Sequence, residues 1–144
     1  MPEREAPSEE TPARGPGRVL VAVYVVFAVA ATSRAAYQIA TDFDAAPLAY
    51  VLSAFAAVVY LLASYGFASP RPGARRIALT ACTTELVGVL VIGSLSLVLP
   101  EDFPDATVWS VYGRGYLFIP LILPILGLLW LRTHAHPDSR KAVP

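Results

Sequence analysis

The sequence predicts an all-α membrane protein: a four-transmembrane-helix bundle with a disordered N-terminal tail and both termini on the cytoplasmic side. Three observations support this fold class. Hydrophobic residues form 56% of the 144-residue chain and charged residues 15%, whereas soluble domains carry about 45–50% apolar and about 25% charged residues. The apolar residues are gathered in four long blocks, and most charged residues lie outside them. The arginines are also distributed unevenly among the segments that join the blocks.

The four blocks cover approximately residues 19–40, 47–68, 77–99 and 113–131. Each block is close to the ~20 residues that a helix needs to cross a hydrocarbon core ~30 Å thick. Most of the 13 prolines lie at the ends of the blocks or outside them, where they end helices instead of breaking them. Strands are not expected, because the blocks are continuously apolar and do not alternate. Residues 18–132 are therefore predicted to form one transmembrane domain.

The two ends of the chain are predicted to be polar tails. Residues 1–17, MPEREAPSEETPARGPG, combine prolines and charges without an apolar period. Such a segment buries too little surface to offset the entropy of ordering it, so we expect disorder. Residues 133–144 form a second cytoplasmic tail. Its two histidines, His134 and His136, are too few for a metal site.

The orientation follows from the basic residues. The positive-inside rule places arginine-rich connections in the cytoplasm. The segments before block one, between blocks two and three, and after block four are basic, and the other two connections are acidic. The aromatic residues Trp109, Tyr112, Tyr116 and Phe118 are expected to form a girdle at the outer face, with Trp130 at the inner one.

A cleaved signal peptide is the alternative interpretation of block one. Arginines precede a 13-residue apolar stretch at 19–31 that contains an A-x-A site at residues 28–30. The long, glutamate-containing segment before it argues against this interpretation. Cleavage would leave three spans without changing their orientation.

Glu85 is an acid within the third block, and no basic residue is beside it. It lies about eight residues from the cytoplasmic start of the block, hence ~12 Å deep. A charge near mid-bilayer costs at least ~3 kcal/mol, so we expect the carboxyl to be protonated, paired or exposed to water. Its helical neighbours Ala78, Ala81, Cys82 and Gly88 are small. Small residues let helices approach closely, so Glu85 is predicted to point into the bundle.

Tyr60 and Arg34 are the expected companions of Glu85 in an intramembrane polar site. Tyr60 lies at a similar depth on the stripe Ser53, Ala56, Ala57, Tyr60, Ser64, and we hypothesise that its hydroxyl bonds to Glu85. Arg34 is expected either to extend to the outer interface, where it meets Asp42 or Asp44, or to pair with Glu85.

The acidic and aromatic segment PEDFPDATVWS is a candidate recognition surface on the outer face. Its candidate residues are Glu101, Asp102, Asp105 and Trp109. The carboxylates could seat a cation or a basic patch of a partner, although such residues are often simply solvated.

Several function classes find no support in the chain. The formal net charge is +0, so no basic field suggests nucleic acid. No nucleophile–base set, phosphate-binding glycine loop or zinc spacing is present, so neither an enzyme nor a cofactor is expected. The bilayer is the expected environment, with a second copy or a larger membrane complex as partner.

The runs TELVGVL (84–90), FPDATVW (103–109) and GYLFIPLILPILGLLWLR (115–132) resemble those of a group of small four-span integral membrane proteins from high-GC Gram-positive bacteria. The resemblance covers most of residues 20–132. It implies a four-span architecture and a bacterial cell membrane, and it implies no chemistry.

Two functions follow as hypotheses. The first is a non-enzymatic accessory or interaction protein, in which Glu85, Arg34 and Tyr60 specify packing. The second is a small proton- or cation-coupled transporter with Glu85 as the exchanging acid. Small multidrug transporters are similar in size and span number, but their key glutamate lies in the first helix and they often have little charge bias. A transporter requires a polar cavity that reaches Glu85, whereas an accessory protein requires Glu85 to be sealed.

Overall fold

The computed structural model describes residues 14–134, and every regular element in that range is a helix. Proline and glycine residues separate the longer helices. Pro47 begins the second long helix, Pro70 and Pro72 follow its end, and Gly73 precedes the third with a φ of 89°. The elements in chain order are α1 (Arg14–Asp42), η1 (Phe43–Ala45), α2 (Pro47–Ala68), α3 (Ala74–Val98), η2 (Pro100–Asp102), η3 (Ser110–Tyr116) and α4 (Ile119–Thr133).

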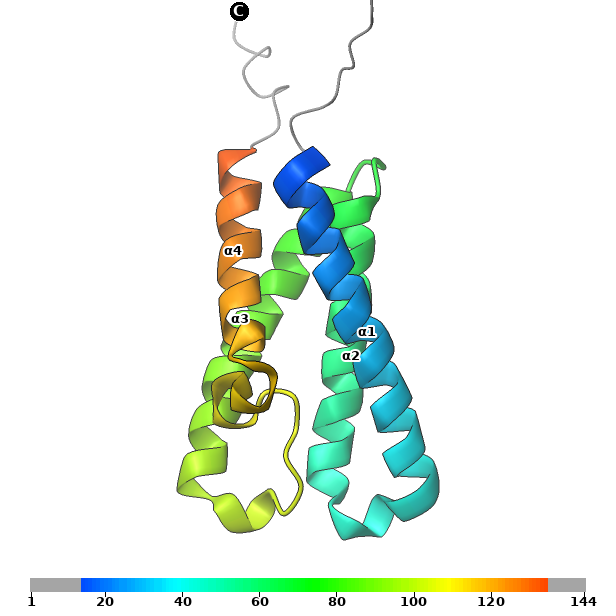
Figure 1. The fold of residues 1–144 in the computed structure, drawn as a ribbon, viewed down its shortest axis with the longest axis vertical. Helices are drawn as coiled ribbons and strands as arrows, with labels where there is room; N and C mark the ends of the chain where they lie inside the picture. The colour runs from blue at the N-terminus through cyan, green and yellow to red at the C-terminus, as the bar shows by residue number, and fades with distance from the viewer. Residues whose placement is uncertain (1–13, 135–144) are drawn as a thin grey trace, which may run out of the picture.

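The long helices form two antiparallel pairs (Figure 1). α1 packs mainly on α2, α2 on α3, and α3 on α4, whereas α1 and α4 have few contacts. The start of α1 and the end of α4 lie at the same end of the bundle, which we call the terminal end. The η1 and η2 turns lie at the opposite end, which we call the loop end.

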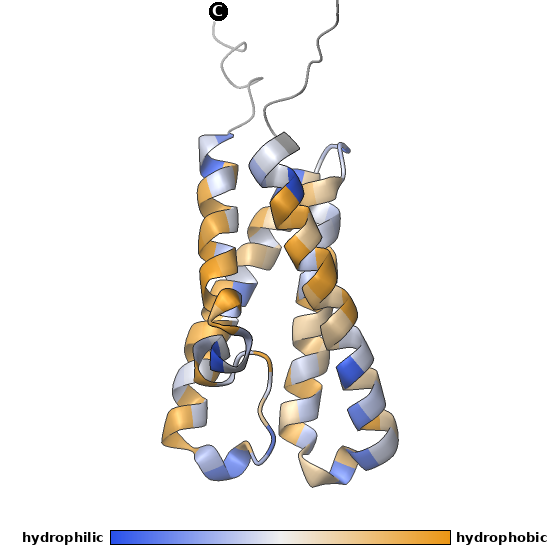
Figure 2. Ribbon diagram, viewed as in Figure 1, coloured by the Kyte–Doolittle hydropathy of each residue, from blue (hydrophilic) through white to orange (hydrophobic). Residues whose placement is uncertain are grey.

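Helices of membrane-spanning length support a helical membrane protein. α1, α2 and α3 are each long and apolar enough to cross a bilayer, and a fourth span exists if η3 and α4 count as one bent span. Many large apolar side chains of the long helices are exposed, and Figure 2 colours much of these helices as hydrophobic. Such a surface suits contact with lipid.

The predicted boundaries agree closely for blocks two and three and less well for block one. α2 covers the predicted residues 47–68, and α3 begins three residues earlier than predicted and ends at Val98. α1 begins at Arg14, so the last four residues of the expected tail are helical. Residues 1–13 and 135–144, including most of both expected tails and His136, lie outside the described residues.

The prediction of one continuous helix over 113–131 is wrong. η3 and α4 meet at an angle of 98°, and Leu117 and Phe118 between them have positive φ values of 59° and 60°. α4 has 15 residues, hence a length of about 22 Å, which is shorter than the hydrocarbon core. Pro120 therefore lies in the first turn of α4, where a missing amide proton breaks no helical hydrogen bond.

Contacts with α3 explain the bend. The Trp109 ring lies over Gly88, where an added Cβ would be 2.5 Å from the ring. Tyr112 lies over Gly93 in the same way, and its hydroxyl is 2.8 Å from Ser94 Oγ. The Val111 amide donates to Ser96 Oγ at 2.8 Å. These contacts hold the segment before α4 against the side of α3 and prevent it from extending the helix.

Candidate functional site

Glu85 is completely buried at the centre of the bundle, as its small neighbours predicted. The Tyr24 hydroxyl of α1 donates to Glu85 Oε1 at 2.7 Å. The same hydroxyl lies 3.4 Å from Cys82 Sγ, one helical turn before Glu85. α1 and α3 are therefore joined by a buried polar cluster of Tyr24, Cys82 and Glu85.

Tyr60 is not the hydrogen-bond partner of Glu85, which corrects the hypothesis made from depth. Its hydroxyl accepts a hydrogen bond from Trp109 Nε1 at 3.0 Å. Tyr60 therefore connects α2 to the segment before η3 instead of to α3. Tyr24 was missed because block one was expected to begin at residue 19, which placed Tyr24 too near the membrane surface. From the observed helix starts at Arg14 and Ala74, Tyr24 and Glu85 lie at similar depths of about 15 Å.

Aromatic rings surround the buried polar cluster. The Tyr24 ring stacks on Phe67 with centroids 5.5 Å apart and lies 6.2 Å from Tyr60. Tyr60 is in turn 6.5 Å from Trp109. Glu85 Oε2 is buried and has no hydrogen-bond partner among residues 14–134. Because the Glu85 side chain is 0% exposed, its carboxyl is sealed from solvent within the bundle.

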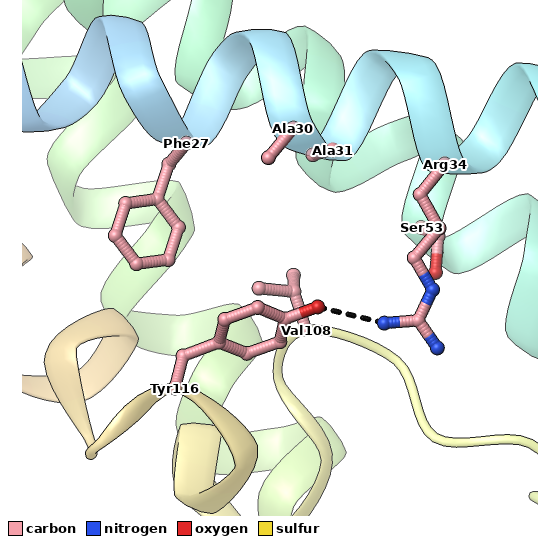
Figure 3. Close-up of a pocket in the computed structure, with 7 residues that line it drawn as sticks. All are labelled: Phe27, Ala30, Ala31, Arg34, Ser53, Val108 and Tyr116. Carbon is pink, nitrogen blue, oxygen red and sulfur yellow. Dashed lines mark hydrogen bonds between the residues drawn. The ribbon is translucent and has the colours of Figure 1, made fainter.

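Arg34 takes neither of the expected partners. Its Nη1 donates to the Tyr116 hydroxyl at 2.7 Å (Figure 3), and its Nη2 donates to the Ala106 carbonyl at 3.2 Å. The structure records no ion pair between Arg34 and a carboxylate of the described residues. The side chain turns sideways because the segment before α4 lies beside α1 at this level, a contact that the sequence pattern does not reveal. Arg34 therefore attaches this segment to α1.

A small cavity lies beside Arg34, between α1, α2 and η3 (Figure 3). Its volume is about 20 Å³, which is enough for one water molecule. Apart from Arg34, Ser53 and Tyr116, its walls are apolar side chains: Phe27, Ala30, Ala31 and Val108. It is too small to admit a substrate.

The candidate recognition segment is divided between exposed and buried residues. Glu101 and Asp102 are exposed. Asp105 is half-buried and accepts a hydrogen bond from the Tyr50 hydroxyl. Trp109 is only 1% exposed, so its expected place on the outer surface and in the aromatic girdle is wrong. Its ring fills the space over Gly88, and this packing removes it from any external surface.

The described residues contain no group of three or more His, Cys, Asp and Glu side chains that could hold a metal ion. The carboxylates of the loop end are spread over separate turns, and Glu85 is far from them in sequence. Comparisons of the chain with protein-family models, with curated proteins and with solved structures found no match.

Proposed function

We propose that this chain is a multi-pass protein of the bacterial cytoplasmic membrane that acts as a non-enzymatic accessory or interaction protein. The proposal rests on the burial of Glu85. Its side chain is 0% exposed, and its Oε1 is occupied by the hydroxyl of Tyr24. An exchanging acid needs a route to water, whereas a sealed acid with a partner on another helix serves to join helices.

Transport by Glu85 ranks second. The observation in its favour is the buried Oε2 atom, which has no partner within the described residues. A carboxyl oxygen with free acceptor capacity is a feature of proton- and cation-binding sites in membranes. The aromatic rings around the cluster oppose this function, because they close the path along which an ion would reach the carboxyl.

The charge distribution supports an orientation with both termini in the cytoplasm. The described basic residues at the terminal end include Arg18, Arg71, Arg75, Arg76 and Arg132, and no described acid accompanies them there. The described acids other than Glu85 lie at the loop end. This asymmetry follows the positive-inside rule.

The packing of α1 supports its retention in the mature protein. Leu20, Tyr24 and Ala28 of α1 are buried in the core. Removal of the first 30 residues would take away the hydrogen-bond partner of Glu85 and uncover the carboxyl. We therefore propose four spans, and we favour this over a cleaved signal peptide.

Self-association or docking on a larger membrane complex completes the proposal. Each long helix presents an apolar outer face, including Phe55, Val58 and Leu62 on α2. In a bilayer such faces meet lipid or other helices equally well. The resemblance to small four-span proteins of high-GC Gram-positive bacteria agrees with this setting and indicates no activity.

A flux measurement with a matched variant tests the proposal. The protein is reconstituted in vesicles, and an imposed pH gradient is followed by an internal dye. Glu85→Gln is the control, because the amide oxygen can still accept the hydrogen bond of Tyr24. We expect no protein-dependent flux from either form, and we expect a stoichiometric partner or a second copy to copurify in mild detergent. Flux that Glu85→Gln abolishes would make transport the function.

A further inference from the structure

Arg34 carries a positive charge that no carboxylate of the described residues neutralises. Its two recorded acceptors, the Tyr116 hydroxyl and the Ala106 carbonyl, are both neutral. They orient the guanidinium plane, and neither of them carries a charge. A guanidinium has five N–H donors, so several remain free to bind an anion. The residue is exposed on the outside of the bundle.

The position of Arg34 along α1 places it near the level of lipid phosphates. Arg34 follows Arg18 by sixteen residues, a separation of about 24 Å along the helix. If Arg18 lies at one boundary of a hydrocarbon core about 30 Å thick, the Cα of Arg34 lies about 6 Å inside the other boundary. The side chain turns sideways to Tyr116 and Ala106, so the guanidinium stays close to this boundary, within reach of a headgroup phosphate.

The rim beyond Arg34 has the opposite charge. Asp42 is the last residue of α1, Asp44 lies in η1, and Glu101 and Asp102 lie in η2 after the end of α3. All four are exposed at the loop end (Figure 1). A purely anionic lipid would be repelled by these carboxylates. A zwitterionic headgroup has its phosphate near the hydrocarbon and its ammonium farther out. It therefore matches an exposed guanidinium near the edge of the hydrocarbon core with a rim of carboxylates farther out.

From this juxtaposition we propose that Arg34 binds the phosphodiester of a zwitterionic phospholipid, whose ammonium group lies among the rim carboxylates. The free N–H groups of Arg34 form charge-assisted hydrogen bonds with the phosphate oxygens. The bonds to Tyr116 and Ala106 hold the guanidinium in place before the lipid arrives, which lowers the entropic cost of binding. The site selects a headgroup by its dipole, and it is independent of the buried cluster around Glu85.

Lipid titration of the full-length chain tests this site. Phosphatidylethanolamine or phosphatidylglycerol with the same acyl chains is added to the protein in mild detergent, and bound lipid is counted by native mass spectrometry. We expect one tightly held phosphatidylethanolamine per chain, bound about tenfold or more tightly than phosphatidylglycerol, a difference of about 1.4 kcal/mol. Arg34→Gln should remove this binding. Arg114→Gln, an exposed arginine of the loop segment, should leave it unchanged.

The rim is tested by a separate variant. Asp42→Asn combined with Asp44→Asn should abolish the preference for phosphatidylethanolamine without preventing lipid binding. This variant and the comparison of two lipids on the native chain remain decisive if Arg34→Gln does not fold. Equal affinity of the native chain for the two lipids would overturn the proposal. Unchanged binding in Arg34→Gln, or displacement of the lipid by millimolar inorganic phosphate, would overturn it as well.

Discussion

At the scale of single residues, hydrogen bonds in the core join polar groups on different helices. Which groups meet depends on how far each helix is shifted along the membrane normal, and the sequence does not determine that shift. The small residues beside Glu85 correctly predicted that its side chain faces inward. The predicted partner, Tyr60, was wrong. An error of a few residues in the expected start of α1 placed Tyr24 at a different depth from Glu85, so Tyr24 was not considered. Depth estimated from apolar blocks is therefore too coarse to pair hydrogen-bonding groups.

A double-mutant cycle tests the pairing of Tyr24 with Glu85. Tyr24→Phe leaves Glu85 Oε1 without its donor in the core, and we expect it to destabilise the fold by about 1–2 kcal/mol. In a Glu85→Leu background the same substitution should cost close to nothing, which gives a coupling energy of about 1–2 kcal/mol. Unfolding in bicelles provides the free energies.

Tyr60→Phe is the control for this cycle, because the Tyr60 hydroxyl bonds to Trp109 and not to Glu85. Its cost should be the same in both backgrounds. A coupling to Glu85 found for Tyr60 and absent for Tyr24 would contradict the geometry of the cluster.

Backbone strain before α4 gives a second prediction at the residue scale. Leu117 has a φ of 59° and is 80% exposed. A non-glycine residue in this left-handed region costs about 1–2 kcal/mol, which exceeds the entropy of about 0.5–1 kcal/mol that glycine loses on folding. We expect Leu117→Gly to stabilise the protein by up to about 1 kcal/mol in the same unfolding assay.

Leu126→Gly provides the matched comparison, since Leu126 is a half-exposed leucine in the regular part of α4. There the substitution should destabilise by about 1 kcal/mol. Effects of the same sign at the two positions would show that Leu117 is not strained.

At the scale of elements, the apolar pattern located three helices well and the fourth poorly. The pattern over 113–131 satisfies the requirement for a span, but it contains no information about Gly88 and Gly93 on another helix. Those glycines create the two hollows that receive Trp109 and Tyr112. Tertiary packing then overrides the local tendency of 113–118 to continue α4.

The close contact between α2 and α3 gives a prediction for an element. A Cβ at Gly66 would lie 2.6 Å from the backbone nitrogen of Ala78, so the helices would have to separate. Alanine is better than glycine in a helix by about 1 kcal/mol, but overpacking against backbone costs more. We expect Gly66→Ala to destabilise by about 1–3 kcal/mol.

Gly115→Ala is the control for this change, because nothing lies within 4 Å of an added Cβ there. Its effect should stay within about 0.5 kcal/mol. Equal effects at Gly66 and Gly115 would mean that α2 and α3 do not meet as closely as described.

At the scale of the whole molecule, the proposed orientation can be tested by cysteine labelling. The native chain is a suitable background, because its one cysteine, Cys82, is fully buried. In intact cells a membrane-impermeant maleimide should label Asp44→Cys and should not label Arg71→Cys until the membrane is permeabilised. Labelling of both positions from the same side would exclude α2 as a membrane span.

The sequence by itself determined the helical membrane class, three of the helices and the inward direction of Glu85. It could do so because hydrocarbon thickness and the cost of burying polar groups act on each helix separately. The tertiary structure decided the partner of Glu85, the sideways course of Arg34, the burial of Trp109 and the bend before α4. Each of these depends on which side chains face one another across helices, and that relation is set by small residues and rings on different elements.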